Sequence, residues 1–79
     1  MNNQEGKVYR KTELVGSSLV SIEDAVRHAV ERAQKTLRHV YWFEVKEQRG
    51  RLASNGSIEY QITVEVGFLL EEPGQENAG

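Results

Sequence analysis

The sequence predicts an α+β subunit in which a three-stranded antiparallel sheet partly wraps around one helix, in the order β-α-β-β. One stretch repeats apolar residues at helical spacing, two alternating stretches flank Asn55-Gly56, and another alternating stretch precedes the helix. Because a helix returns the chain between the first two strands, these strands run in the same direction. An all-antiparallel sheet therefore needs the last strand in the middle.

The first strand is predicted over residues 7–15. This segment mixes β-branched, aromatic and charged residues in rough alternation, which is typical of a short strand with one face toward water. Gly16 and the two serines after it are expected to end the strand.

A helix is predicted from Ile22 to His39. Ser21 and Asp24 form a capping-box-like pair, with the carboxylate at the positive end of the helix dipole. One face carries apolar residues at steps of three and four, many of them alanines: Ile22, Ala25, Val26, Ala29, Val30, Ala33, Leu37 and Val40. Since alanines let another backbone approach closely, a curved sheet is expected to wrap this helix tightly.

The last two strands are predicted to form a hairpin. Asn55-Gly56 favours a two-residue type I′ turn, which needs positive φ at both positions. Such a turn sets a register with these cross-strand pairs: Val45 with Val66, Phe43 with Phe68, and Lys46 with Glu65. Strict alternation then directs Phe43 and Val45 toward the helix and Trp42 to the opposite face.

The predicted helix is too short for the predicted sheet. Residues 22–39 make a helix of about 27 Å, whereas a strand over residues 57–70 would reach roughly 45 Å. The strands must bend around the helix or extend past it, and both arrangements leave apolar surface for a neighbouring subunit. The lengths therefore favour an oligomer.

Composition narrows the range of functions. A chain of 79 residues makes one small domain with little buried surface, and without cysteine it has neither disulfides nor a thiolate metal site. Its two histidines do not make a metal cage, so no metal is predicted and oligomerisation is the remaining source of stability. A net charge of −2 argues against nucleic acid as a partner.

The protein is expected to be soluble and cytoplasmic. No apolar run approaches the roughly 20 residues that span a bilayer, and the start MNNQEGK lacks the hydrophobic segment of a signal peptide. Both ends are polar, which predicts disordered tails at residues 1–6 and 71–79 around a single domain of residues 7–70.

Four segments resemble the bacterial dodecins: ELVG, KTLRHV, WFEVKEQRG and YQITVEVGF, in the family's order and spacing. The resemblance covers residues 7–70. It implies a β-α-β-β subunit assembled into a hollow homododecamer. It also implies a protein that binds flavin for storage and photoprotection without catalysis, usually FMN, with riboflavin as the second flavin. Some bacterial members are expected to bind coenzyme A.

The resemblance also assigns roles to four residues. Trp42 matches the tryptophan that stacks on the isoalloxazine ring, and Gln61 matches the glutamine that hydrogen-bonds the polar edge of that ring. Lys7 and Arg49 match basic residues associated with the ligand's phosphate. A flat, electron-rich indole suits this task because it can stack on an electron-poor ring and quench its excited state by donating an electron.

The chain departs from the family at two positions. Where bacterial dodecins read GFRL, this chain has Leu69 in place of the arginine, and Tyr41 replaces a frequent aspartate before the tryptophan. The alternative function is therefore a dodecameric structural or nucleotide-binding module that binds coenzyme A and has weak or lost flavin affinity. An enzyme is not predicted, because no nucleophile with an adjacent base is found in the sequence.

The predicted register also bears on how the site is built. It separates Trp42 from Gln61 by about eight residues along the ladder, or roughly 27 Å. Both side chains of one straight subunit cannot reach the same ring. Each flavin site is therefore expected to be built by more than one subunit.

Overall fold

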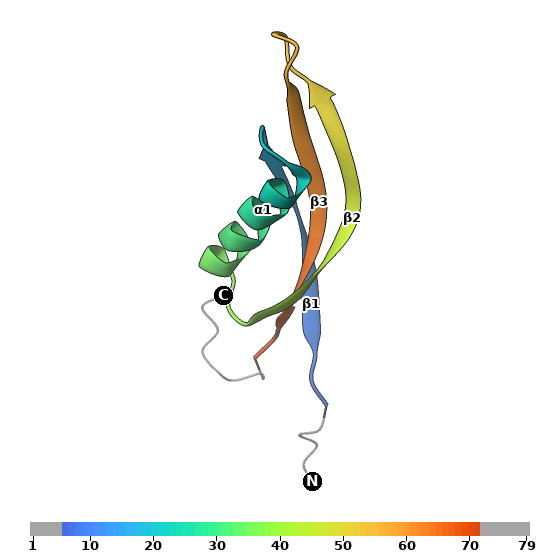
Figure 1. The fold of residues 1–79 in the computed structure, drawn as a ribbon. Coiled ribbons are helices and arrows are strands. Elements are labelled where there is room, and N and C mark those ends of the chain that lie inside the picture. The colour runs from blue at the N-terminus through green and yellow to red at the C-terminus, as the bar shows by residue number, and fades with distance from the viewer. Residues whose placement is uncertain (1–5, 72–79) are drawn as a thin grey trace.

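The computed structural model describes residues 6–71 as one helix packed on one three-stranded sheet (Figure 1). The elements in chain order are β1 (Tyr9–Ser18), α1 (Ile22–Thr36), β2 (Val40–Leu52) and β3 (Ile58–Leu69). The sheet order is β1-β3-β2 with both pairings antiparallel, so the predicted fold class and the central position of the last strand are confirmed.

The boundaries differ from the predicted ones in two elements. β1 continues through Gly16 to Ser18, because these residues pair with β3 instead of turning away. α1 ends at Thr36, and His39, at φ 62°, helps the chain turn into β2. The predicted tails, residues 1–6 and 71–79, lie outside the described residues apart from Gly6 and Glu71, and the domain limits stay a prediction.

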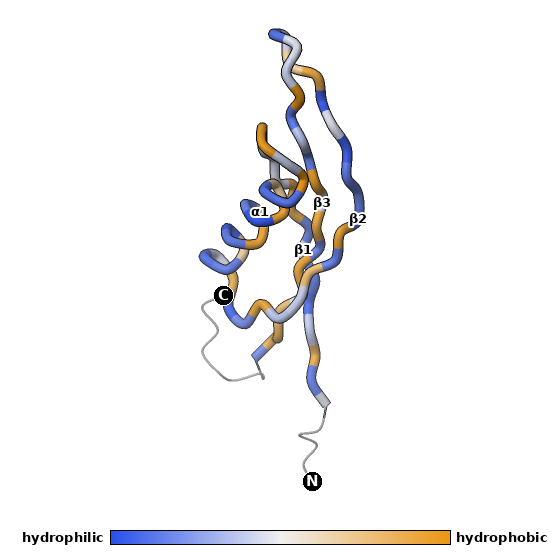
Figure 2. Tube along the Cα trace, viewed as in Figure 1, coloured by the Kyte–Doolittle hydropathy of each residue, from blue (hydrophilic) through white to orange (hydrophobic). Residues whose placement is uncertain are grey.

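The core lies where α1 crosses β3. Its buried residues are three alanines of the helix and three β-branched residues of the strand: Ala25, Ala29, Ala33, Ile62, Val64 and Val66. The alanines recur every four residues and so share one face of the helix. Figure 2 shows the hydrophobic side of α1 turned toward the strands. The alanine stripe therefore does what the sequence predicted and brings the helix close to the sheet.

The backbone of β1 approaches α1 closely at Gly16. A Cβ atom at this position would lie against the carbonyl oxygen of Ala25, 3.0 Å from Ala29 Cβ and 3.2 Å from Ala29 N. Real Cβ atoms rarely come this near to backbone atoms, so the packing of the helix on β1 requires glycine here.

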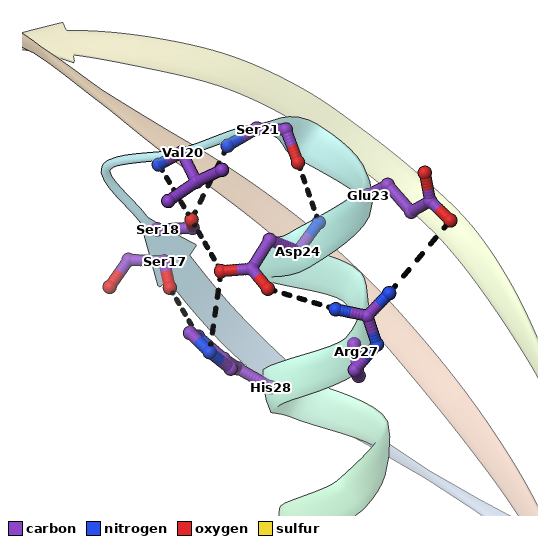
Figure 3. A network of polar contacts seen from close by, with 8 residues as sticks. All are labelled: Ser17, Ser18, Val20, Ser21, Glu23, Asp24, Arg27 and His28. Carbon is purple, nitrogen blue, oxygen red and sulfur yellow. Dashed lines mark hydrogen bonds and ion pairs between the residues drawn. The ribbon is translucent and has the colours of Figure 1, made fainter.

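A polar network joins the end of β1 to the start of α1 (Figure 3). The Ser21 hydroxyl accepts a hydrogen bond from Asp24 N at 3.0 Å, which confirms the predicted N-cap. The Ser18 hydroxyl, only 6% exposed, donates to Asp24 Oδ2 at 2.8 Å and accepts from Val20 N at 2.9 Å. Arg27 Nη1 donates to the other carboxylate oxygen at 2.9 Å. Asp24 thus ties the strand, the turn and the helix together.

The hairpin turn is not the predicted type I′ turn. Gly56 N donates to Ala53 O at 2.9 Å, Ala53 N donates to Ser57 O at 2.8 Å, and φ is positive at Gly56 (91°) but not at Asn55. This is a three-residue loop in which a glycine in the left-handed conformation follows a turn. Asn55 Oδ1 accepts from Ser57 N at 3.0 Å, so the asparagine holds the loop through its side chain.

Two bulges in β2 shift the register further. Tyr41 and Lys46 are the extra residues. The bulge at Lys46 and the three-residue loop together place Phe43 opposite Val66 and Val45 opposite Val64, each two positions from its predicted partner. A bulge inserts one residue and exchanges the faces of all residues beyond it. Trp42 and Glu44 precede the bulge at Lys46. They therefore share a face of the sheet with the odd-numbered residues of β2 that follow this bulge.

Much of β2 lies outside the cover of the helix. Phe43 and Val45 are on the side of the sheet that carries α1, as predicted, yet they are 46% and 49% exposed because the helix packs mainly on β1 and β3. The hairpin end of β2 and β3 extends beyond the helix (Figure 1). The radius of gyration is 16.2 Å, compared with about 11 Å for a compact chain of this size. This elongated shape with exposed apolar side chains supports the expectation of subunit association.

Candidate functional site

The indole of Trp42 lies flat on the outward face, the side of the sheet away from α1. Trp42 pairs with Gly67 of β3, and a Cβ atom added to Gly67 would run into three neighbouring atoms of the indole's six-membered ring. The three atoms are almost equally close, so the face of the ring covers the glycine. Trp42 is 36% exposed, which leaves surface for a flat ligand on the indole's other side.

Two tyrosines adjoin this tryptophan. The Tyr9 ring meets the indole edge-on, with ring centroids 5.2 Å apart and an interplanar angle of 65°. The Tyr41 ring lies 6.0 Å from the Tyr9 ring at 57°. Both separations are in the range of favourable aromatic contacts. Tyr9, Tyr41 and Trp42 are called the aromatic cluster below.

Sequence reasoning did not single out Tyr9 or Gly67 as site residues. A lone glycine within an otherwise β-branched strand is the signal that could have found Gly67, since such a glycine often marks the close approach of another group.

Replacing Gly67 with alanine is expected to displace the indole. The added Cβ would occupy the space of the ring, and the side chain would move because it is partly exposed while the strand backbone is fixed by its pairing. Trp42 is the chain's only tryptophan, so its fluorescence spectrum reports the displacement directly. Far-UV circular dichroism should stay unchanged, and an unaltered emission maximum would contradict the flat placement of the indole on Gly67.

Gln61 and Arg49 form the second predicted part of the site. They are register partners, and Arg49 Nε donates to Gln61 Oε1 at 2.8 Å. Strict alternation from Trp42 would have put Arg49 on the helix side, and the bulge at Lys46 returns it to the outward face. Because the amide oxygen accepts from Arg49, only the NH2 group of Gln61, which also hydrogen-bonds the Glu59 carboxylate, can donate to a ligand.

The four predicted residues fall into two separate groups. Gln61 is six residues from Gly67, the partner of Trp42, which corresponds to roughly 20 Å along β3 and not the 27 Å predicted. Lys7 lies just before β1 at the Trp42 end of the sheet, where Tyr9 pairs with Leu69, and its side chain is exposed. One chain thus joins Arg49 to Gln61 but does not bring either of them to Trp42.

A row of three glutamates lies between the two groups. Glu13, Glu65 and Glu44 are register neighbours across β1, β3 and β2. Lys11 Nζ is 3.3 Å from Glu65 and 3.5 Å from Glu44, and Lys46 Nζ is 3.8 Å and 3.9 Å from the same carboxylates. The Glu65 hydrogen bond, together with the Glu44 charge, raises the pKa of Lys11.

Within residues 6–71 no group of three or more His, Cys, Asp or Glu side chains is placed to hold a metal ion.

The hairpin end carries an ion pair between Arg51 and Glu59. Arg51 Nε donates to Glu59 Oε1 at 2.8 Å, and this hydrogen bond lowers the pKa of Glu59. A carboxyl group whose pKa is lowered by folding stabilises the protein at pH values above its unfolded-state pKa. This stabilisation is lost as the pH falls through the folded-state pKa.

Carbon-detected NMR of the Glu59 carboxyl is expected to give a titration midpoint below that of an ordinary glutamate. The Arg51→Gln variant should return the midpoint toward the ordinary value, because it removes the donated hydrogen bond. Equal midpoints in the two proteins would show that Arg51 does not hold this carboxylate in solution.

A cavity of about 330 Å³ lies on the helix side, where α1 ends. Its lining includes three basic side chains, Arg10, Arg38 and His39, beside the apolar Phe68. Arg38 and His39 both contact the Glu71 carboxylate, at 3.2 Å and 3.0 Å.

Within the described part of the chain, no helix is long and apolar enough to cross a membrane.

Comparison with known proteins identifies close relatives. The dodecin from Thermus thermophilus is 58% identical over 67 residues, which are 85% of this chain and 97% of that protein. A protein named calcium dodecin from Mycobacterium tuberculosis is 36% identical over 63 residues, 80% of this chain and 89% of the relative.

Solved structures agree with this likeness. A Thermus thermophilus crystal structure at 58% identity superposes with a TM-score of 0.78 over 85% of this chain and 98% of its own. The dodecin from Streptomyces coelicolor, at 42% identity, gives a TM-score of 0.79 over 87% and 99% of the two chains. The family model described as Dodecin matches residues 8–71. Fold, length and sequence therefore agree, and the chain belongs to the dodecin family.

Proposed function

We propose that this protein binds flavin, with FMN as the first ligand and riboflavin as the second, for storage and photoprotection. The observation that carries the proposal is the indole of Trp42, held flat on Gly67 with its other side exposed. An isoalloxazine ring can stack on that side. An indole in stacking contact can also donate an electron to the excited flavin, which quenches it before it reacts with other molecules.

The proposed site takes residues from more than one subunit. Within a chain, the Arg49–Gln61 pair is roughly 20 Å from Trp42 along β3, too far for both to reach one ring. A homododecamer, implied by family membership, would supply the second group from a neighbour. The Gln61 amide would then donate to a ring carbonyl, while Arg49, together with Lys7, would attract the phosphate of FMN. A structure of the complex with Trp42 and Gln61 of the same chain on one ligand would overturn this arrangement.

Binding without catalysis is part of the proposal, and the surroundings of three side chains support it. The buried Ser18 hydroxyl donates to Asp24 and is 6% exposed, so it is not available as a nucleophile. Glu44 and Glu65 on the outward face lie within 3.9 Å of the Lys11 and Lys46 ammonium groups, so these carboxylates are engaged in ion pairs.

Flavin fluorescence titration tests the proposal. Free FMN and riboflavin should lose most of their emission as the protein is added, and the mass in solution should correspond to twelve chains, the assembly implied by the family. Emission that stays unchanged at saturating protein would contradict flavin binding, whatever the mass.

The Leu69→Arg variant is expected to bind FMN more tightly without a matching gain for riboflavin. Leu69 pairs with Tyr9 beside the aromatic cluster, so an arginine there would meet a phosphate near the stacked ring. A hydrogen bond to a charged group contributes about 1.5–3 kcal/mol, which is roughly 10- to 150-fold in Kd. Calorimetry with both flavins measures the difference.

Leu70→Arg is the matched control for that variant. It adds the same charge one residue later, where strand alternation directs the side chain to the helix side. An equal gain in FMN affinity in both variants would show that net charge, and not placement beside the cluster, is responsible.

Coenzyme A binding is the second candidate function, and the basic cavity at the end of α1 favours it. Arg10 beside an apolar wall suits a phosphorylated ligand with an uncharged portion, and Arg38 and His39 would join it by exchanging their contacts with Glu71 for the phosphate. Calorimetric titration with coenzyme A, with and without saturating FMN, distinguishes a separate site from competition at Trp42.

A further inference from the structure

We propose that Tyr9 and Tyr41 form a path by which an oxidising equivalent leaves Trp42 and reaches the protein surface. An indole that gives up an electron becomes a reactive radical, and its repair requires a nearby donor. The aromatic cluster places one phenol in contact with the indole and a second phenol in contact with the first. The proposal does not require flavin, because any one-electron oxidant of the indole starts the same sequence.

The geometry of the cluster supplies the path. Tyr9 is the central ring, 5.2 Å from Trp42 and 6.0 Å from Tyr41 between centroids. Electron transfer between rings in such contact needs no intermediate group. Exposure rises along the path in the single chain, from 36% at Trp42 and 38% at Tyr9 to 59% at Tyr41. The last ring is therefore the one most open to a reductant in water.

The oxidising equivalent moves from Trp42 to Tyr9 and then to Tyr41. A one-electron oxidant takes an electron from Trp42 and leaves an indole radical cation. The Tyr9 phenol returns an electron to the indole and releases its proton to water, which leaves a tyrosyl radical. Tyr41 then passes an electron to that radical, which takes up a proton from water, while Tyr41 loses its own proton. A one-electron reductant such as a thiol or ascorbate, with a proton from water, restores the Tyr41 phenol.

The bulge at the start of β2 accounts for the position of Tyr41. Tyr41 is the extra residue between Val40 and Trp42, and regular alternation would send consecutive side chains to opposite faces. The bulge instead lets Tyr41 reach the ring of Tyr9, whose other contact is Trp42. This arrangement gives the tyrosine that stands in place of the family's frequent aspartate a role of its own.

The third tyrosine provides an internal control. Tyr60 pairs with Ser18 and Gly50, seven residues along β3 from Gly67, which is roughly 23 Å from the cluster. Strand alternation also puts it on the helix side with Ile62 and Val64. Tyr60→Phe should therefore change neither radical formation nor repair at Trp42.

Flash photolysis of the flavin-free protein tests the path. A ruthenium tris-bipyridine photo-oxidant with an electron acceptor oxidises the indole, and transient absorption follows the tryptophan and tyrosyl radicals separately. In the unmodified protein the tyrosyl signal should rise as the tryptophan signal decays. Tyr9→Phe should lengthen the tryptophan signal severalfold and increase the oxidised-indole products found by mass spectrometry.

Two further variants make the result decisive. Tyr41→Phe should keep the first transfer but slow the reduction of the tyrosyl radical by added ascorbate. Trp42→Phe should remove the delayed rise of the tyrosyl signal. A tyrosyl signal that rises equally in the Trp42→Phe protein, or a tryptophan radical whose lifetime is unchanged by Tyr9→Phe, would overturn the proposal. Since flavin is absent, these outcomes are independent of whether flavin binds.

Discussion

Replacing Gly16 with alanine is expected to lower the free energy of unfolding by about 1–3 kcal/mol or more, which is a large part of the stability of a small domain. The new Cβ would press against the carbonyl oxygen of Ala25 and the backbone nitrogen of Ala29. These are backbone atoms of a helix, so no rotation of a side chain can relieve the contact. The helix must move off β1, and the alanine packing against β3 would loosen with it.

Urea unfolding followed by circular dichroism measures this change, at one fixed protein concentration because assembly would couple stability to concentration. Gly50→Ala is the matched control, since its Cβ would meet Ile58 Cγ2 at an ordinary 3.6 Å. Both variants make the same chemical change in a strand. Equal unfolding midpoints for the two would contradict the close crossing of β1 and α1 at Gly16.

The fold could be predicted because its signals are local and agree with one another. Ser21 caps the helix, the alanines mark its buried face, and Ile62, Val64 and Val66 alternate as a central strand should. Each of these patterns is set by the geometry of a single element. The order of the strands then follows from chain direction alone, which is why the topology was predicted together with the elements.

The register could not be predicted in the same way, because it depends on insertions that leave little trace in composition. Asn55-Gly56 fits a two-residue turn as well as the observed loop of residues 54–56. Nothing about Lys46 or Tyr41 marks it as the extra residue of a bulge. Each such event shifts every pair farther from the turn, so the loop and the bulge at Lys46 together moved Phe43 two positions from its predicted partner.

The residues of the candidate site stay predictions, whereas their arrangement is observed and differs from the one that the sequence predicted. Arg49 and Gln61 are bonded to each other because the bulge changes the face on which Arg49 lies. In the observed register, Trp42 and Gln61 are still roughly 20 Å apart along β3. The expectation of a site shared between subunits therefore does not depend on the turn type that was predicted wrongly.

Replacing Trp42 with alanine is expected to cause the largest loss of flavin affinity of any single substitution. Stacking of an aromatic side chain on a base contributes about 1–3 kcal/mol, which is roughly 5- to 150-fold in Kd. The loss should be at least in this range, because the isoalloxazine ring is larger than a base. Calorimetry or ultrafiltration must measure binding here, since the quenching itself depends on the indole.

Trp42→Phe separates the two tasks of the indole. A phenyl ring still offers a flat surface above Gly67, but it is a much poorer electron donor than an indole. Binding should therefore be largely retained in this variant while bound flavin stays bright and bleaches faster under light. If the bound flavin were quenched as strongly as in the unmodified protein, electron donation by Trp42 would not be the protective step. Another donor, with Tyr9 the nearest ring at 5.2 Å from the indole, would then have to take that role.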